Sequence, residues 1–189
     1  MKLTDAVAVL AAVGIAECQP APVAAVPDGS DPAVVQTATT RGVSFDHAAG
    51  LETRTCEGDM PRCIVLFDPA AEEFMRDLLT VQVFDGPLET VAAAEAGFEP
   101  DAGGRLMTTY GRFEPVAVEA FEVNGRSALR AVVTCGVSDP ETGFHAAGGE
   151  CLWAVVSDGA QSVVISSSGF GNGLEAAEAA VRSIRLTPD

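Results

Sequence analysis

Short runs in which apolar and polar residues alternate make up most of the chain after residue 41, and turn residues separate them. A period of two residues is typical of strands that bury one face. Val43 and Phe45 alternate with polar residues before a turn at Gly50, which predicts a hairpin over residues 43–55. Asn124-Gly125 and Asp158-Gly159 indicate tight hairpins further along. Consecutive hairpins predict an antiparallel sheet. The other strand-like runs span residues 63–68, 78–86, 105–115, 116–137, 151–159 and 161–169.

Helical periodicity interrupts these strands in three places. Asp68-Pro69 supplies an N-cap and a first-turn proline, so we expect a short helix with Phe74 and Leu78 on one face. The alanine-rich segment 87–98 predicts a second helix, and residues 173 to about 185 predict a third. The third helix has an apolar stripe of Leu174, Ala177, Val181 and Ile184, and a wet-face pair of Glu178 and Arg182.

A glycine-rich turn leads into the third helix at Gly169, Gly171 and Gly173. A dinucleotide-binding loop needs the pattern G-x-G-x-x-G, whereas the sequence reads G-F-G-N-G-L. Asn172 and Glu175 have the spacing of a capping box, in which side chains bind the helix's own free amides. We therefore interpret this turn as a structural corner with its anion site filled internally.

Length and charge narrow the classes of function. A chain of 189 residues suits one domain with appendages. Its formal net charge of −16 repels phosphate backbones and anionic lipid surfaces, so we expect no nucleic-acid partner.

The N-terminal segment resembles an export signal. An apolar run from Ala6 to Ala16 follows one lysine and is too short to span a bilayer. The ending Ile15-Ala16-Glu17-Cys18 resembles the lipobox of bacterial lipoproteins, in which the cysteine is acylated, although Glu17 departs from that pattern. Cleavage after Ala25 is one alternative, and a short buried helix is another.

These features predict three segments. Residues 1–18 form the export signal, of lipoprotein type if Cys18 is the lipidation site, and residues 19–40 form a Pro/Ala-rich tether. Residues 41–189 form a single globular α+β domain. The expected location is the periplasm or cell envelope, and the expected membrane contact is a lipid anchor at Cys18.

Four further cysteines suit disulfides in an exported chain. Three connectivities are open. We favour Cys56 with Cys63 and Cys135 with Cys151, because each pair flanks a turn-rich insert. Residues 138–150, within the second insert, form a long loop that could serve in recognition.

Motifs for catalysis, metals and cofactors are lacking in the sequence. It has no G-x-S-x-G, S-x-x-K, H-E-x-x-H or C-x-x-C, and its two histidines, His47 and His145, lie far apart. We expect both histidines to be exposed polar residues. The expectation is no enzyme, no metal and no cofactor, and the alternative is a small periplasmic hydrolase that uses His47 or His145.

The order of elements resembles that of a known family. The phrases GVSF, LTVQVFDGPLETVAAAEAG, FEVNGRSALRAVV and AVRSIRL, over residues 41–187, resemble the PsbP-like fold. That fold is an α/β/α sandwich with an antiparallel sheet, shared by photosystem subunits, a Ran-binding regulator and bacterial envelope lipoproteins. The resemblance implies a non-enzymatic binding or assembly role. Separately, we expect a monomer whose partner is an unknown envelope protein. The cysteines and the insert at 138–150 depart from the family pattern.

Overall fold

The computed structural model describes residues 35–187, except residues 41, 59, 61, 112 and 139–144, and gives only the backbone of 137, 138 and 145–147. The predicted export signal, the acylated Cys18, the tether up to residue 34 and the tip of the 138–150 loop lie outside the described residues. Among the residues described, no helix is both long and apolar enough to cross a bilayer.

A seven-stranded antiparallel sheet forms the centre of the domain. Its strand order is β3-β4-β5-β12-β11-β10-β9, so most neighbouring strands are also consecutive in the sequence. The strands are β3 (Glu52–Thr55), β4 (Cys63–Phe67), β5 (Asp77–Asp85), β9 (Glu119–Val123), β10 (Arg126–Ser138), β11 (His145–Ser157) and β12 (Gln161–Ser167). This sheet confirms the predicted antiparallel arrangement.

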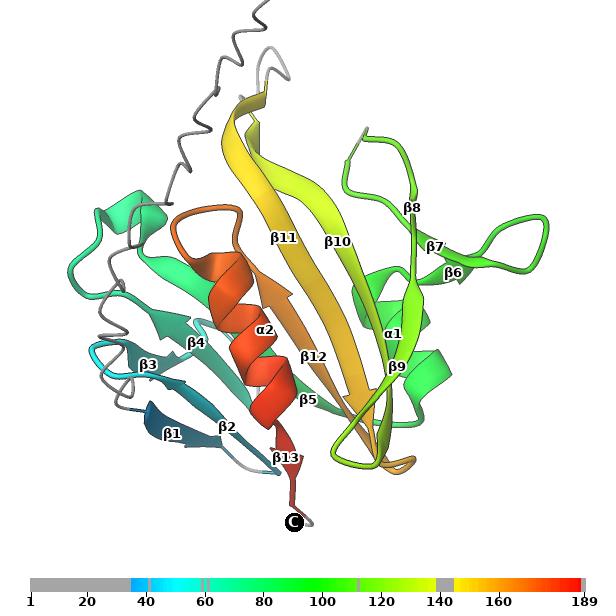
Figure 1. The fold of residues 1–189 in the computed structure, drawn as a ribbon, viewed down its shortest axis with the longest axis horizontal. Helices are drawn as coiled ribbons and strands as arrows, with labels where there is room; N and C mark the ends of the chain where they lie inside the picture. The colour runs from blue at the N-terminus through cyan, green and yellow to red at the C-terminus, as the bar shows by residue number, and fades with distance from the viewer. Residues whose placement is uncertain are drawn as a thin grey trace, which may run out of the picture. The chain divides into compact units, whose positions relative to one another are not determined.

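Helices and small sheets cover the two faces of this central sheet. Figure 1 shows α2 (Gly173–Ser183) in front of the sheet and α1 (Leu88–Ala96) behind it. On the α2 side lies a sheet of β1 (Val35–Thr40), β2 (Val43–Ala48) and β13 (Arg185–Leu186). A third sheet consists of β6 (Glu99–Pro100), β7 (Leu106–Thr108) and β8 (Val116–Ala117). The arrangement confirms the predicted α+β sandwich.

Two apolar cores result, one on each face of the sheet. Phe45, Leu66 and Ile165 are fully buried in the core below α2, together with Ala177 and other α2 residues. The core below α1 is built around Phe98, Val155 and the alanines of the helix. Alternate residues of each strand enter opposite cores, because successive side chains on a strand point to opposite faces.

The two long helices follow the sequence prediction closely. α1 ends where Gly97 adopts a left-handed conformation (φ 61°) and its N–H binds the Ala92 carbonyl. α2 buries Ala177 and Val181, as its apolar stripe predicted. Local sequence was sufficient here because each helix carries its own apolar face and its own termination signal.

The predicted short helix after Asp68 is wrong. The structure has only a 3₁₀ turn, η1 (Glu73–Met75), and Leu78 belongs to β5. β4 and β5 are adjacent antiparallel strands, so residues 68–76 must reverse the chain, and Asp68 N–H closes that reversal on the Arg76 carbonyl at 2.9 Å. The Asp68 carboxylate accepts a bond from Ala70 N–H within the turn at 2.8 Å.

The predicted hairpin over residues 43–55 is also wrong. β2 pairs with β1 on one side and with β13 on the other, so both of its edges are occupied. β3 instead pairs with β4 in the central sheet. Gly50 does turn the chain with a positive φ of 93°, but it carries the chain from one sheet to another.

Two further segments differ from the sequence prediction. Val35–Thr40, which the sequence assigned to the tether, form β1 and pair with β2. The loop expected over residues 138–150 is shorter than predicted, because β10 and β11 stay paired as far as Ser138 and His145.

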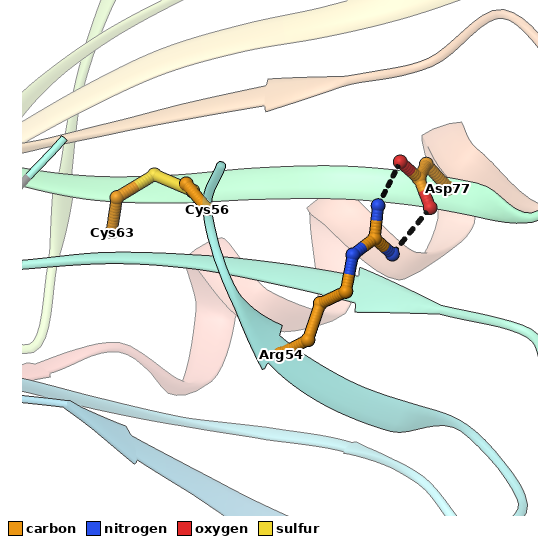
Figure 2. Close-up of a disulfide and its surroundings, with 4 residues drawn as sticks. All are labelled: Arg54, Cys56, Cys63 and Asp77. Carbon is orange, nitrogen blue, oxygen red and sulfur yellow. Dashed lines mark hydrogen bonds and ion pairs between the residues drawn. A yellow bond between two sulfur atoms is a disulfide. The ribbon is translucent and has the colours of Figure 1, made fainter. Parts of the chain in front are cut away.

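The favoured disulfide pairing is the one in the structure. Cys56–Cys63, with Cα atoms 5.4 Å apart, closes the β3–β4 hairpin, and Figure 2 shows it near the Arg54–Asp77 ion pair. Arg54 donates two bonds of 2.7 Å to the Asp77 carboxylate, and these bonds raise the pKa of Arg54. Cys135–Cys151, with Cα atoms 5.8 Å apart, links β10 to β11 within the α1-side core.

Candidate functional site

A cavity of about 570 Å³ opens beside α2, and we call it the α2 groove. Its walls come from the end of β2, the 68–75 reversal, the glycine-rich turn and one face of α2. Its apolar lining residues are Ala48, Ala49, Leu51, Ala71, Met75, Leu78, Ala176 and Ala179, and its polar ones are His47, Asp68, Asn172, Glu175 and Arg182. Gly171 completes the lining.

His47 lies in this groove and is not the exposed residue expected from the sequence. Its side chain is only 8% exposed, and its ring lies 6.3 Å from that of Phe45. The ring Nδ1 is 3.0 Å from the Ala48 carbonyl oxygen. Because a carbonyl oxygen can only accept, Nδ1 carries the hydrogen of this bond.

The glycine-rich turn positions the N-terminus of α2 at one end of the groove. A Cβ on Gly173 would lie 2.5 Å from the Ser168 carbonyl oxygen and 2.9 Å from that of Leu78. A Cβ on Gly169 would lie 2.7 Å from Gly149 N and 2.8 Å from Cys135 Sγ. These glycines therefore allow close packing of backbone, which supports the interpretation of this segment as a corner.

The predicted capping box, however, is not formed. Asn172 occupies the N-cap position of α2, but its side chain makes no capping hydrogen bond. Asn172 has φ −95° and ψ 25°, outside the extended conformation in which an N-cap side chain reaches the helix amides. The side chains of Asn172 and Glu175 line the groove instead.

The electrostatic balance of the groove is negative. Asp68 and Glu175 contribute carboxylates, and the one basic lining residue, Arg182, is paired with Glu178 at 3.4 Å. That pair confirms the predicted contact on the wet face of α2. An apolar rim continues beside the groove, where the exposed Phe74 packs edge-on against Phe170 with ring centroids 6.2 Å apart.

The chemistry available in the groove is limited. No serine, threonine, cysteine, lysine or tyrosine is among the residues that line it. Hydrolases of the serine, threonine or cysteine type need such a side chain beside their base. In the part of the chain that is described, no three histidine, cysteine, aspartate or glutamate side chains gather as a metal site would require. The lining combines apolar walls with polar side chains, and His47 supplies its only aromatic ring nitrogens.

Comparison with solved structures identifies the fold. The solution structure of cyanobacterial PsbP (CyanoP) from Synechocystis sp. PCC 6803 matches 84% of this chain and 96% of its own, with a TM-score of 0.50 and 16% identity. The chain has a PsbP-like fold. A crystal structure from Bacteroides thetaiotaomicron matches 78% of this chain and 46% of its own, with a TM-score of 0.43 and 7% identity. No protein-family model and no curated protein matches the sequence.

The candidate residues from the sequence analysis lie in different parts of this fold. His47 lines the α2 groove on β2, whereas His145 starts β11 opposite Ser138, with its side chain outside the described part. The four domain cysteines serve as two structural crosslinks. Sequence reasoning missed Asp68 and Met75 as groove residues because it placed them in a helix, and it missed Glu175 because it assigned that carboxylate to the helix cap.

Proposed function

We propose that the protein is an exported binding or assembly module whose contact site is the α2 groove. The observation that carries this proposal is a groove with mostly apolar walls and two carboxylates in its lining. The PsbP-like fold supports such a role at a coarse level, because its likeness to CyanoP extends over most of both chains.

The chemistry of the groove defines its partner. Alanine, leucine and methionine side chains favour apolar groups, and Asp68 and Glu175 favour a positive charge. The net charge of −16 adds long-range attraction for a basic partner. The partner is therefore an envelope protein that presents an apolar segment with a lysine or arginine.

Crosslinking in intact cells tests this proposal. A photo-crosslinking residue at position 179, in the groove, should give a protein adduct, whereas the same residue at Thr53, an exposed position on β3, should give none. Glu175→Arg should abolish the adduct. Glu122→Arg, which changes the net charge equally on the exposed β9, should retain it. Equal adducts at both positions, or an adduct that survives Glu175→Arg, would remove the groove from the proposal.

Export is supported by the two disulfides, because such crosslinks persist in oxidising compartments. Anchoring is tested separately, by cell fractionation. Cys18→Ala should release the protein from the membrane fraction if Cys18 is acylated. Cleavage after Ala25 predicts a soluble protein with or without that substitution. An unprocessed chain in the cytosol would contradict export altogether.

A hydrolase that uses His47 is the second candidate, favoured only by the position of that ring in the groove. With no hydroxyl, thiol or amine nucleophile in the lining, His47 would act as a general base on water. Esterase, phosphatase and peptidase substrates should show no turnover. A turnover that disappears in His47→Gln would establish catalysis and refute the binding-only role.

A further inference from the structure

A second cavity, of about 310 Å³, lies on the opposite face of the central sheet, beside the C-terminal end of α1. Its floor is formed by β5, β12 and β11, and its lining includes Glu95 and Ala96 of the helix. We call it the α1 cavity. Its volume is at the lower end of the range for small-molecule sites, roughly 300 to 1,000 Å³.

Strand register brings the floor of this cavity together. Thr80 of β5 is opposite Ser166 of β12, and Ser166 is opposite Trp153 of β11. Gln82 and Phe84 follow Thr80 at intervals of two residues, so they point to the same face of the sheet. Three strands thus present an ordered set of side chains to one cavity.

The polar side chains of this set are uncharged and have no hydrogen-bond partner among the described residues. Thr80, Gln82 and Ser166 are half-buried, and their side chains make no hydrogen bond to any described residue. Together they provide two hydroxyl groups and one amide, each able both to donate and to accept. Half-buried polar groups without protein partners favour a ligand or water that can satisfy them.

Aromatic rings form the apolar part of the lining. Trp153 and Phe84 both line the cavity and are half-buried. Tyr110 packs edge-on against Trp153, with ring centroids 5.9 Å apart, and its hydroxyl donates to the Gly136 carbonyl at 2.8 Å. The indole is therefore in contact with a ring that is itself hydrogen-bonded to β10.

We propose that the α1 cavity binds a neutral saccharide unit. A sugar ring has apolar C–H faces that pack on aromatic rings and a rim of hydroxyls that donate and accept hydrogen bonds. The lining supplies both, with Trp153 and Phe84 for the faces and the Thr80, Gln82 and Ser166 side chains for the hydroxyls. Glu95 is the only charged lining residue, so the cavity offers an anion no counter-charge. This site is independent of the α2 groove.

Trp153 is the only tryptophan in the chain, so its fluorescence reports on the cavity directly. The full chain is titrated with glucose, N-acetylglucosamine and the β-1,4-linked disaccharide of each. At least one of these sugars should give a saturable change in Trp153 emission. Gln82→Met and the double variant Thr80→Val with Ser166→Ala should each weaken binding about tenfold, because each removes hydrogen bonds to the sugar.

Matched controls separate this site from folding and from the α2 groove. Thr53→Val makes the same chemical change on β3, outside the cavity, and should leave the titration unchanged. Glu175→Gln, in the α2 groove, should also leave it unchanged. Circular dichroism confirms that each variant is folded. No saturable response to any of the four sugars, or binding that survives both cavity variants, would overturn the proposal and leave the proposed role of the α2 groove intact.

Discussion

Cys135 and Cys151 are bonded to one another although they are not opposite each other in the β10–β11 ladder. Cys135 faces Gly149, and Cys151 faces Val133. The disulfide therefore runs diagonally between the two strands, and both cysteines are buried, with exposures of 2% and 3%. It crosslinks the long hairpin near its loop end, within the α1-side core.

Removal of this crosslink should destabilise the domain substantially. Its two cysteines are 16 residues apart, and on the chain-entropy model Cys135→Ala with Cys151→Ala should cost roughly 2 to 4 kcal/mol. That is a large part of a typical stability of about 5 to 15 kcal/mol. Urea unfolding measures the change. Peptide mapping without reduction should recover Cys135 with Cys151, and a peptide that joins either to Cys56 would contradict the hairpin register.

The two disulfides should differ in how readily they are reduced. Cys56 is half-exposed and lines a surface hollow with Cys63, whereas Cys135 and Cys151 are both buried. Thiol attack requires access to a sulfur atom. Under a mild reductant without denaturant, labelling and mass spectrometry should find free Cys56 and Cys63 first. Equal labelling of both pairs would show that the hairpin opens as readily as the surface turn.

Two glycines of the corner before α2 should respond differently to asparagine. At Gly169 a Cβ would meet Gly149 N at 2.7 Å, so Gly169→Asn should cost about 1 to 3 kcal/mol through overpacking. At Gly171, where φ is +53° and the nearest contact is Leu78 Cδ2 at 3.7 Å, asparagine fits the left-handed conformation and should cost less than about 1 kcal/mol. Thermal unfolding of the two variants tests this order.

Acid should weaken the domain through three aspartates whose pKa values lie below the ordinary 3.8. Asp46 accepts bonds from Arg185 at 2.6 Å and from Thr37 at 2.8 Å, and both lower its pKa. The backbone N–H groups of Arg105 and Gly103 lower the pKa of Asp101. The backbone N–H of Gln161 is the main cause of the lowered pKa of Asp158.

The sign of this effect follows from proton linkage. Each carboxyl binds a proton more weakly in the folded state, so its contribution is complete above about pH 4 and is lost as the pH falls through the folded pKa. The urea concentration at the unfolding midpoint should therefore be constant near neutral pH and should decrease when the pH is lowered below about 4. Asp158→Asn should make that fall shallower. An unchanged slope in this variant would show that Asp158 does not titrate with folding.

Local sequence was sufficient where an element carries its own signals. The Asn124-Gly125 turn has positive φ at both residues, 52° and 72°, as the tight hairpin predicted from this pair requires. α1 has its apolar face and its Gly97 terminus within about ten residues. Long-range partners decided the rest. Asn124 also donates to the Ile184 carbonyl at 2.9 Å, which joins the turn to the end of α2 and which no local pattern encodes.

The candidate site was much less predictable than the fold. His47 has the same neighbours in sequence whether β2 pairs with β3 or with β1 and β13, yet only the second pairing places its ring in the α2 groove. Asp68 and Glu175 are more than 100 residues apart in sequence, yet both line the α2 groove.

The sequence by itself determined the α+β class, the two long helices, the later hairpins and the favoured cysteine pairs, because these depend on periodicity, turn residues and short spacings. Only the tertiary structure decided which sheet β2 and β3 join, that residues 68–76 turn instead of forming a helix, and which side chains line the two cavities. The physical reason is that a strand's edges satisfy their hydrogen bonds equally well with any neighbour of suitable register. The choice among neighbours is made by packing over the whole domain.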